Sequence, residues 1–228
     1  MPTQTRFDQR RARTRAALIT AAQKLLAERR TNVPVLEITQ LADVGLGSFY
    51  NHFTDKDELF ETAVDDALEH FGSILDKLSD HDDPAVVFAQ SLRLTVRLCR
   101  SEPELTRVLL HRGLDITVAD RGLVPRARRD IEAGIAAGRF RSTDSRIAVP
   151  IVAGGALALA ALLDTDPVRN AGNVADSFAV DMLCMLGLPE SDAVEICGLD
   201  LPNVDDLLTP TSSTESPTSP PPGPLLSD

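Results

Sequence analysis

Residues 45–56 gather small and hydrogen-bonding side chains whose types and spacing suit contact with double-stranded DNA. Tyr50 and His52 can donate hydrogen bonds to phosphate oxygens, contacts that fix the register on a duplex but carry no sequence information. Ser48 and Asn51 can reach base edges, and Leu46 can pack on a thymine methyl group. The residues of this expected contact surface are Gly45, Leu46, Gly47, Ser48, Tyr50, Asn51, His52 and Lys56.

Lys56 adds a cation at the start of the following helix. Thr54 with Asp57 resembles a capping box, which places Lys56 in the first turn. A cation there opposes the helix dipole by roughly 0.3–1 kcal/mol, and an arriving phosphate would reverse that penalty. A lone first-turn lysine is usually just solvated, but Tyr50, His52 and Lys56 in one register favour phosphate contact. Gly47 allows the backbone a close approach to another surface.

Two short helical runs must position these side chains. Residues 35–42 and 46–52 are separated by Asp43, Val44 and Gly45, the spacing of a helix-turn-helix, whose second helix enters the major groove. Each run has apolar residues at helical spacing, which predicts a buried face. These apolar residues are Val35, Ile38, Leu41 and Ala42 in the first run, and Phe49 and Phe53 in and after the second.

The segment from Asp43 to Phe53, DVGLGSFYNHF, followed by DKDELF from Asp55 to Phe60, resembles the DNA-binding signature of the TetR family of one-component bacterial transcriptional regulators. The resemblance covers about residues 10–60. It implies an all-α fold with an N-terminal three-helix helix-turn-helix domain and a larger C-terminal helical domain for ligand binding and dimerisation. It also implies a homodimer on a pseudo-palindromic operator, most often a repressor, which a small molecule releases.

The match departs from the family at three positions, Asp43, Gly45 and Leu46, where members often carry Gly, Ser and a polar residue. Asp tolerates the left-handed turn conformation. Gly45 removes a side-chain cap from the recognition helix, and Leu46 cannot hydrogen-bond a base. We therefore expect readout partly through Ser48, Asn51 and DNA shape.

The charge is divided unevenly along the chain. The net charge is −11, yet residues 1–30 hold eight Arg or Lys against two acidic residues, giving +6 there and −17 elsewhere. Because salt screens charges over about 8–10 Å, a duplex senses the nearby surface rather than the total. A basic N-terminal run alone can be a solubilising tail. Just before a helix-turn-helix, we expect it, including Arg13, to lie along phosphates.

Cysteine usage and the N-terminus bear on the compartment. The three cysteines, Cys99, Cys184 and Cys197, form no CxxC pair, so neither a disulfide framework nor a zinc site is indicated. The arginine-rich N-terminus is followed by no apolar stretch, so it does not resemble a secretory signal. We expect a cytoplasmic protein without a metal or other cofactor.

Apolar periodicity predicts further helices over 16–29, 55–78, 84–100, 103–114, 123–137, 144–163 and 174–186, with a short one over 189–198. The helix from residue 55 would start beside the DNA and act as a lever. We expect a DNA-binding domain over 1–54 and a ligand-binding and dimerisation domain over 55–200. Residues 201–228, Pro/Ser/Thr-rich from Thr209, are expected to be a disordered tail.

Residues 147–163 are seventeen uncharged residues, the lower edge of a membrane span. Pro150 lies inside the run and no basic cluster flanks it, so we expect no membrane partner. A helix that is apolar all round is more simply buried on two sides, by its own core and by a partner subunit. Helices over 144–163 and 174–186 resemble the pair through which the TetR family dimerises as a four-helix bundle.

The effector should enter between the helices of residues 84–140 and 147–163, whose composition indicates a mainly apolar compound. Expected apolar lining residues are Phe88, Leu92, Val96 and Ile151; expected polar anchors are Arg97, Arg107 and His111. Arg93, Arg97 and Arg100 recur on one helix face, as a solvated stripe or, less simply, as a lining for an acidic ligand group.

Two other functional classes compete with a ligand-responsive regulator. An enzyme is disfavoured because the four histidines are scattered, and no Glu-x-x-His pair, nucleophile elbow or phosphate loop occurs. A ligand-independent DNA-binding protein, or an activator of the same fold, stays open. An internal cavity is the feature that separates a ligand-responsive regulator from a ligand-independent one.

Overall fold

The computed structural model describes residues 6–76, 81–141 and 144–202, and every regular element in these ranges is helical. The expected all-α class is therefore confirmed. The elements are α1 (Arg6–Ala27), α2 (Val35–Leu41), α3 (Leu46–Phe49), α4 (Lys56–Leu75), α5 (Pro84–Ser101), α6 (Pro103–Arg112), the 3-10 helix η1 (Gly113–Val118), α7 (Leu123–Ala136), α8 (Ser145–Thr165), α9 (Ala171–Met185) and α10 (Glu190–Cys197). The predicted tail from Thr209 lies outside the described residues.

Two helix boundaries in the N-terminal part differ from expectation. Helix α1 begins at Arg6 rather than Ala16, because arginine, alanine and glutamine are good helix formers and extend it through the basic run. Helix α3 ends at Phe49 rather than His52. The backbone N–H groups of His52 and Phe53 both donate to the Phe49 carbonyl, at 2.9 and 3.0 Å, and close the chain into a turn. The η1 segment was not predicted.

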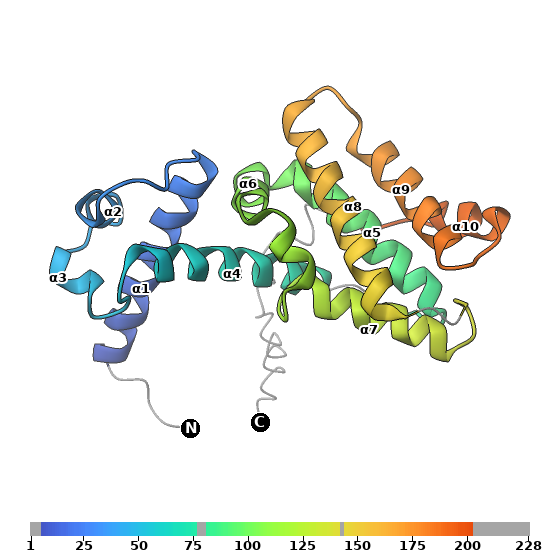
Figure 1. Cartoon of the computed structure of the whole chain (residues 1–228), viewed down its shortest axis with the longest axis horizontal. Coiled ribbons are helices and arrows are strands. Elements are labelled where there is room, and N and C mark those ends of the chain that lie inside the picture. The colour runs from blue at the N-terminus through green and yellow to red at the C-terminus, as the bar shows by residue number, and fades with distance from the viewer. Residues whose placement is uncertain (1–5, 77–80, 142–143, 203–228) are drawn as a thin grey trace, which may run out of the picture.

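Helix α4 connects the two ends of the molecule (Figure 1). Its twenty residues span about 30 Å. The expected capping box lies one residue later than predicted: the Asp55 carboxylate accepts from the Glu58 N–H at 2.8 Å, and the Glu58 carboxylate accepts from the Thr54 N–H at 2.7 Å. Asp55 therefore replaces Thr54 as the cap, and Lys56 still lies in the first turn.

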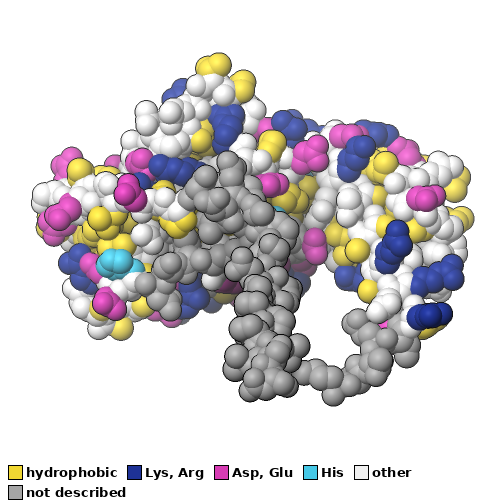
Figure 2. All heavy atoms as spheres, turned by 180° about the vertical axis from the view of Figure 1, so that it is seen from behind, with side chains coloured by type: hydrophobic (Ala, Val, Ile, Leu, Met, Phe, Trp, Pro, Cys, Tyr) yellow, Lys and Arg dark blue, Asp and Glu magenta, His cyan; other side chains and the backbone are white. Residues whose placement is uncertain are grey.

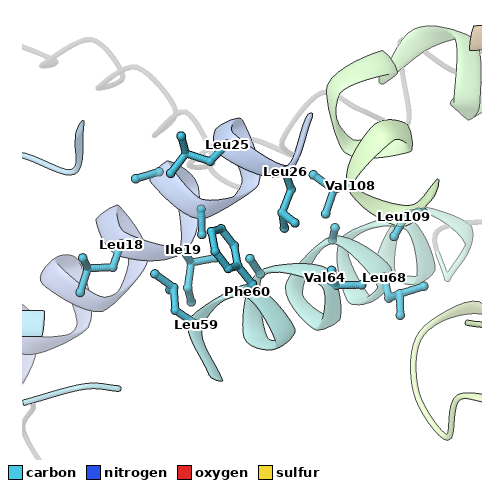
Figure 3. Close-up of a cluster of buried hydrophobic side chains, with 14 of the residues drawn as sticks. Leu18, Ile19, Leu25, Leu26, Leu59, Phe60, Val64, Leu68, Val108 and Leu109 are labelled. Carbon is cyan, nitrogen blue, oxygen red and sulfur yellow. The ribbon is translucent and has the colours of Figure 1, made fainter. Parts of the chain in front are cut away.

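Helix α4 shares a hydrophobic core with α1 and α6, as Figure 3 shows. Ile19 of α1 lies beside Leu59 and Phe60 of α4, and Val108 of α6 joins the same cluster next to Leu26 of α1. A fully buried leucine contributes about 1.5–3 kcal/mol. Because the same cluster joins the N-terminal helices, α4 and α6, α4 packs directly against the helices that carry the helix-turn-helix.

The buried face of α2 differs partly from the prediction. Ile38 is fully buried, but Leu41 in the last turn is 42% exposed. Thr39 is buried instead, and it satisfies its hydroxyl by donating to the Leu36 carbonyl at 2.9 Å. The helix is only two turns long and ends at Leu41, so its final residue projects beyond the core. Phe49 and Phe53 are buried as expected.

A second core fills the space among α5, α7, α8, α9 and α10. Arg93 and Arg97 of α5 clamp α9 to this body through Asp176, at 2.7 and 2.9 Å. Arg93 is 5% exposed and also donates to the Leu199 carbonyl at 2.8 Å. These arginines are thus neither the solvated stripe nor the ligand lining that the sequence suggested, because α9 brings a carboxylate directly over α5.

Candidate functional site

The structure brings the predicted residues 45–56 together at one end of the molecule, where α3 is the outermost helix (Figure 1). Tyr50 is 60% exposed and Leu46 45% exposed, both high for such apolar side chains. Gly45, Gly47 and Asn51 are exposed as well, and Ser48, His52 and Lys56 are half-buried. The surface is therefore open to a large partner.

Aromatic packing holds this surface in place. Phe49 and Phe53 fill the core beneath it with their ring centroids 6.0 Å apart. The Tyr50 ring meets Phe49 edge-on at 5.2 Å. Asp43 in the preceding turn has φ 52°, the left-handed conformation that aspartate was expected to tolerate. The turn and the two phenylalanines together fix where α3 projects.

Two arginines of the predicted basic run, which the sequence reasoning did not single out, adjoin this surface. Arg11 and Arg15 of α1 line a notch with His52, next to Asp8 and Ala12. The Arg15 guanidinium lies 5.4 Å from the centre of the Phe53 ring, a cation–π distance. Burial, followed by the charges of Arg11 and Arg15, lowers the pKa of His52 below its ordinary value. Arg11 and Arg15 are four residues apart, and this spacing could have indicated that they lie on one face of α1.

Arg13 is exposed on a different side of α1, since residues two apart on a helix are separated by about 200°. Figure 2 shows dark blue Arg and Lys side chains at the end of the molecule that carries the start of α1. No salt bridge among the described residues involves the arginines at positions 6, 10, 11, 13 or 15. This end of the molecule thus presents positive charge to an anionic partner.

A cavity of about 100 Å³ lies inside the C-terminal body. Its walls come from α4, α5, α6, η1, α7 and α8, and most of the lining is aliphatic or aromatic. Two predicted ligand-binding residues, Phe88 and Leu92, line it. An engineered apolar cavity of about 150 Å³ holds benzene, so this space is of the same order of size as a site for one small ring, and somewhat smaller.

The structure places the other five predicted ligand residues elsewhere. Val96 packs with Leu163 and Ala175, and Arg97 binds Asp176. Arg107 of α6 forms a salt bridge with Asp164 of α8 at 2.8 Å. His111 is exposed on α6, outside the cavity lining, and Ile151 is 48% exposed on α8. Along α5 the cavity receives residues 88, 91, 92, 95 and 99, so positions 96 and 97 rotate away from it.

The polar part of the lining includes two charged residues of α7 that the sequence reasoning missed. Asp130 is 4% exposed, and burial raises the pKa of its carboxyl group, against a smaller opposing effect of Arg129. Arg126 lies one turn earlier on the same helix and also lines the cavity. Ser91, Thr95 and Thr106 add hydroxyl groups. Arg126 and Asp130 are four residues apart, beside apolar Val124 and Ile131, and this spacing could have indicated that both lie on one face of the helix.

Cys99 also lines the cavity. Burial raises the pKa of its thiol to about 11, and the Sγ atom donates to the Thr95 carbonyl at 3.3 Å. The thiol is therefore protonated near neutral pH and serves as part of the wall. Across residues 6–76, 81–141 and 144–202, no three His, Cys, Asp or Glu side chains are grouped so as to hold a metal ion.

Family comparisons match most of the chain. Residues 18–63 match the model of bacterial regulatory proteins of the tetR family. Residues 83–198 match the model of the tetracyclin repressor-like C-terminal domain. No curated protein matches the chain.

Several solved structures are also similar to this chain over most of its length. The structure of RolR in complex with its ligand resorcinol has 36% sequence identity and a TM-score of 0.60, covering 86% of this chain and 98% of that one. RolR without ligand has 35% identity and a TM-score of 0.59, with 83% and 99% covered. The fatty acid degradation regulator FadR from Bacillus halodurans, at 18% identity and a TM-score of 0.63, covers 76% of this chain and 94% of its own; it shows a similar fold.

Proposed function

Because this chain belongs to the TetR family of bacterial transcriptional regulators, we propose that it is a homodimeric repressor released from its operator by a small aromatic effector. Members of this family bind DNA through the helix-turn-helix and are not enzymes. The observation that carries the proposal is the exposed α3 surface, flanked by arginines without salt-bridge partners among the described residues.

The DNA contacts follow from this surface. In a dimer, two copies of α3 must lie about 34–36 Å apart to enter successive major grooves of a pseudo-palindrome. Tyr50, His52 and Lys56 contact phosphates together with Arg11 and Arg15, while Ser48 and Asn51 reach bases. We place the boundary of the DNA-binding domain at residues 54 and 55, where the Asp55 cap starts α4.

The outer faces of α8 and α9 form the dimer interface in this proposal. Helix α8 is long and apolar enough to cross a membrane by length and composition alone. Only 28% of the most apolar 18-residue stretch of this helix is buried within one chain. Ile147 is 61% exposed and Ile151 is 48% exposed. Covering these residues with the same face of a second copy removes that apolar surface from water. A regulator assembled in this way works in the cytoplasm.

The effector enters the cavity among α4–α8. RolR is similar to this chain and binds resorcinol, a benzene ring with two hydroxyl groups. The apolar walls suit such a ring, and the buried Asp130 carboxyl can accept a hydrogen bond from a phenolic hydroxyl. Arg129 donates to one oxygen of this carboxyl at 3.0 Å, and a hydrogen bond from a ligand hydroxyl is worth more at a buried carboxyl than at the surface. The effector class is therefore a small hydroxylated aromatic compound.

Release requires two states. An effector lowers operator affinity only by its differential affinity for the state in which the α3 helices are wrongly spaced. Helix α4 joins both sites, since Phe71 and Leu75 line the cavity and Leu59 packs against α1. Filling the cavity can therefore change the position of the helix-turn-helix.

A gel-shift titration with DNA from upstream of the protein's own gene tests the proposal. We expect a salt-sensitive complex of one dimer per site at micromolar protein or below, and its loss on addition of resorcinol. The absence of any such complex with upstream fragments would refute the regulator assignment. A complex indifferent to hydroxylated aromatics would refute the effector class alone.

A further inference from the structure

Helix α4 carries a stripe of acidic residues that face arginines from the body. Glu61, Asp65, Glu69 and Asp76 lie on one side of the helix, as residues four and seven apart do. Arg112 of α6 pairs with Glu61, and Arg121, which follows η1, pairs with Asp65 at 2.7 Å. Arg126 of α7 pairs with Glu69 at 3.0 Å and also with Asp76. Three arginines thus tie the lever to the rest of the chain.

Of these three arginines, Arg126 is the one that also lines the cavity. Two carboxylates hold its guanidinium against α4: Nε donates to Asp76 at 2.9 Å, and Nη2 donates to both Asp76 and Glu69. Nη1 donates to the carbonyl of Gly122, just before α7, at 2.8 Å. The side chain is 18% exposed. One residue therefore has the cavity beside it and the carboxylates of α4 at its charged end.

Gly72 in the C-terminal half of α4 is explained by this contact. A glycine within a helix costs roughly 0.5–1 kcal/mol relative to alanine. A Cβ atom at position 72 would overlap the Arg126 guanidinium, which lies directly against the α4 backbone there. The lever thus carries a helix-weakening residue at the point where the cavity arginine reaches it.

We propose that Arg126 couples the cavity to the lever: a ligand oxygen that binds the guanidinium from the cavity side weakens its bonds to Asp76 and Glu69 and frees the C-terminal end of α4. This inference rests on the proposed function. The physical basis is competition for one cation, since the ligand binds Arg126 more tightly when α4 does not share it. That difference is the differential affinity that a two-state switch requires. The shared core of α4 and α1 carries the displacement to α3.

The test uses the full-length protein, its operator and resorcinol as the probe. The quantity measured is the ratio of operator Kd with and without saturating resorcinol, with resorcinol binding followed separately by calorimetry. We expect the wild type to change by about fivefold or more, within the usual range of allosteric coupling. The double variant Asp76→Asn, Glu69→Gln should bind resorcinol yet change by less than about twofold.

Two further variants sharpen the test. Arg121→Gln removes an ion pair from the same α4 stripe without touching the cavity, so it should keep the wild-type ratio. Gly72→Ala should displace the Arg126 guanidinium and lose the response, while its circular dichroism shows an intact helical fold. It keeps the test valid if the double variant folds poorly.

Three results would overturn the coupling role. One is a double variant and Gly72→Ala that bind resorcinol and retain the wild-type ratio. Another is loss of resorcinol binding itself, which would make these groups part of the ligand site only. The third is a wild type whose operator binding ignores resorcinol; it also refutes the proposed effector class, and it is seen before any variant is compared.

Discussion

Arginine has opposite surroundings in the two ends of this molecule. In the C-terminal body, Arg93, Arg107 and Arg126 each bind a carboxylate of another helix or its cap, at 2.7, 2.8 and 2.9 Å. In α1, no salt bridge among the described residues involves the arginines at positions 6, 10, 11, 13 and 15. The body uses arginine to hold helices together, whereas α1 presents it to a partner outside the chain.

This difference explains how a DNA-binding chain can carry a net charge of −11. Carboxylates in the body pair with its arginines, and the acidic surplus lies in the part of the chain that follows α1. At an ionic strength near that of a cell, charges farther away than about 8 Å are largely screened. A duplex at α3 therefore meets the nearby charges, which include the +6 of residues 1–30 and the acidic Asp55, Asp57 and Glu58 at the start of α4, rather than the total.

The largest effect, on stability, should come from replacing a buried arginine of the C-terminal body. Arg93→Met removes a buried guanidinium from Asp176 and from the Leu199 carbonyl. We expect the free energy of unfolding to fall by about 2–4 kcal/mol, towards the lower end because Asp176 is partly exposed. Urea denaturation measures it. Arg146→Met, which removes a solvent-exposed pair with Asp144, should leave the midpoint unchanged; equal decreases in both variants would contradict the clamp.

Replacing the arginines of α1 should instead weaken DNA binding. Arg11→Gln with Arg15→Gln should weaken operator binding by about tenfold or more at low salt and make the slope of log K against log salt shallower by about 0.9 for each phosphate that is no longer neutralised. Fluorescence anisotropy across a salt series measures both quantities. The matched control is Arg121→Gln in the body. A slope that changes as much in the control as in the α1 variant would remove the distinction between the two regions.

A smaller effect concerns the buried carboxyl of the body. Burial raises the folded-state pKa of Asp130, so the folded protein holds this proton more tightly than the unfolded chain does. The resulting penalty is absent below the unfolded pKa near 3.9, grows as pH rises towards the folded pKa, and is complete above it. Asp130→Asn should therefore stabilise the fold more at pH 7 than at pH 4. Thermal unfolding at the two pH values measures this, and a pH-independent difference would be the contrary result.

The smallest effect should be the pH dependence of DNA binding that comes from His52, which lines the notch with Arg11 and Arg15. The pKa of His52 is lowered in the free protein by burial and by Arg11 and Arg15, and a bound phosphate would raise it again. Operator binding should thus take up a proton, and affinity should rise as pH falls from 7.5 through about 6.5. Comparing this pH dependence with that of His52→Gln isolates the contribution. An identical pH dependence in the variant would place His52 away from phosphate.

The helix-turn-helix could be predicted because its signals are local. The turn residue Asp43, the buried pair Phe49 and Phe53, and the exposed Tyr50 are all set by neighbours within a few residues. The start of α1 was misplaced because hydrophobic periodicity begins at Leu18, while helix propensity alone extends the helix to Arg6.

The cavity was harder to predict because its lining depends on how far each helix is rotated. On α5, Phe88 and Leu92 face the cavity but Val96 turns towards α8 and α9. Arg97 was expected at a ligand, and the carboxylate of Asp176, 79 residues later in the chain, binds it instead. Asp130 and Arg126 were missed for the same reason, since long-range packing decides which charges become buried.

The most direct test of the proposed DNA-binding role is the salt dependence of wild-type binding to its own operator. Titration of a labelled upstream duplex by anisotropy, at several salt concentrations, gives the stoichiometry and the slope together. We predict two protomers per site and an affinity that falls steeply with salt, by about 0.9 in log K per phosphate contact for each tenfold rise. A complex insensitive to salt, or a strictly monomeric protein that binds no duplex at micromolar concentration, would contradict this role.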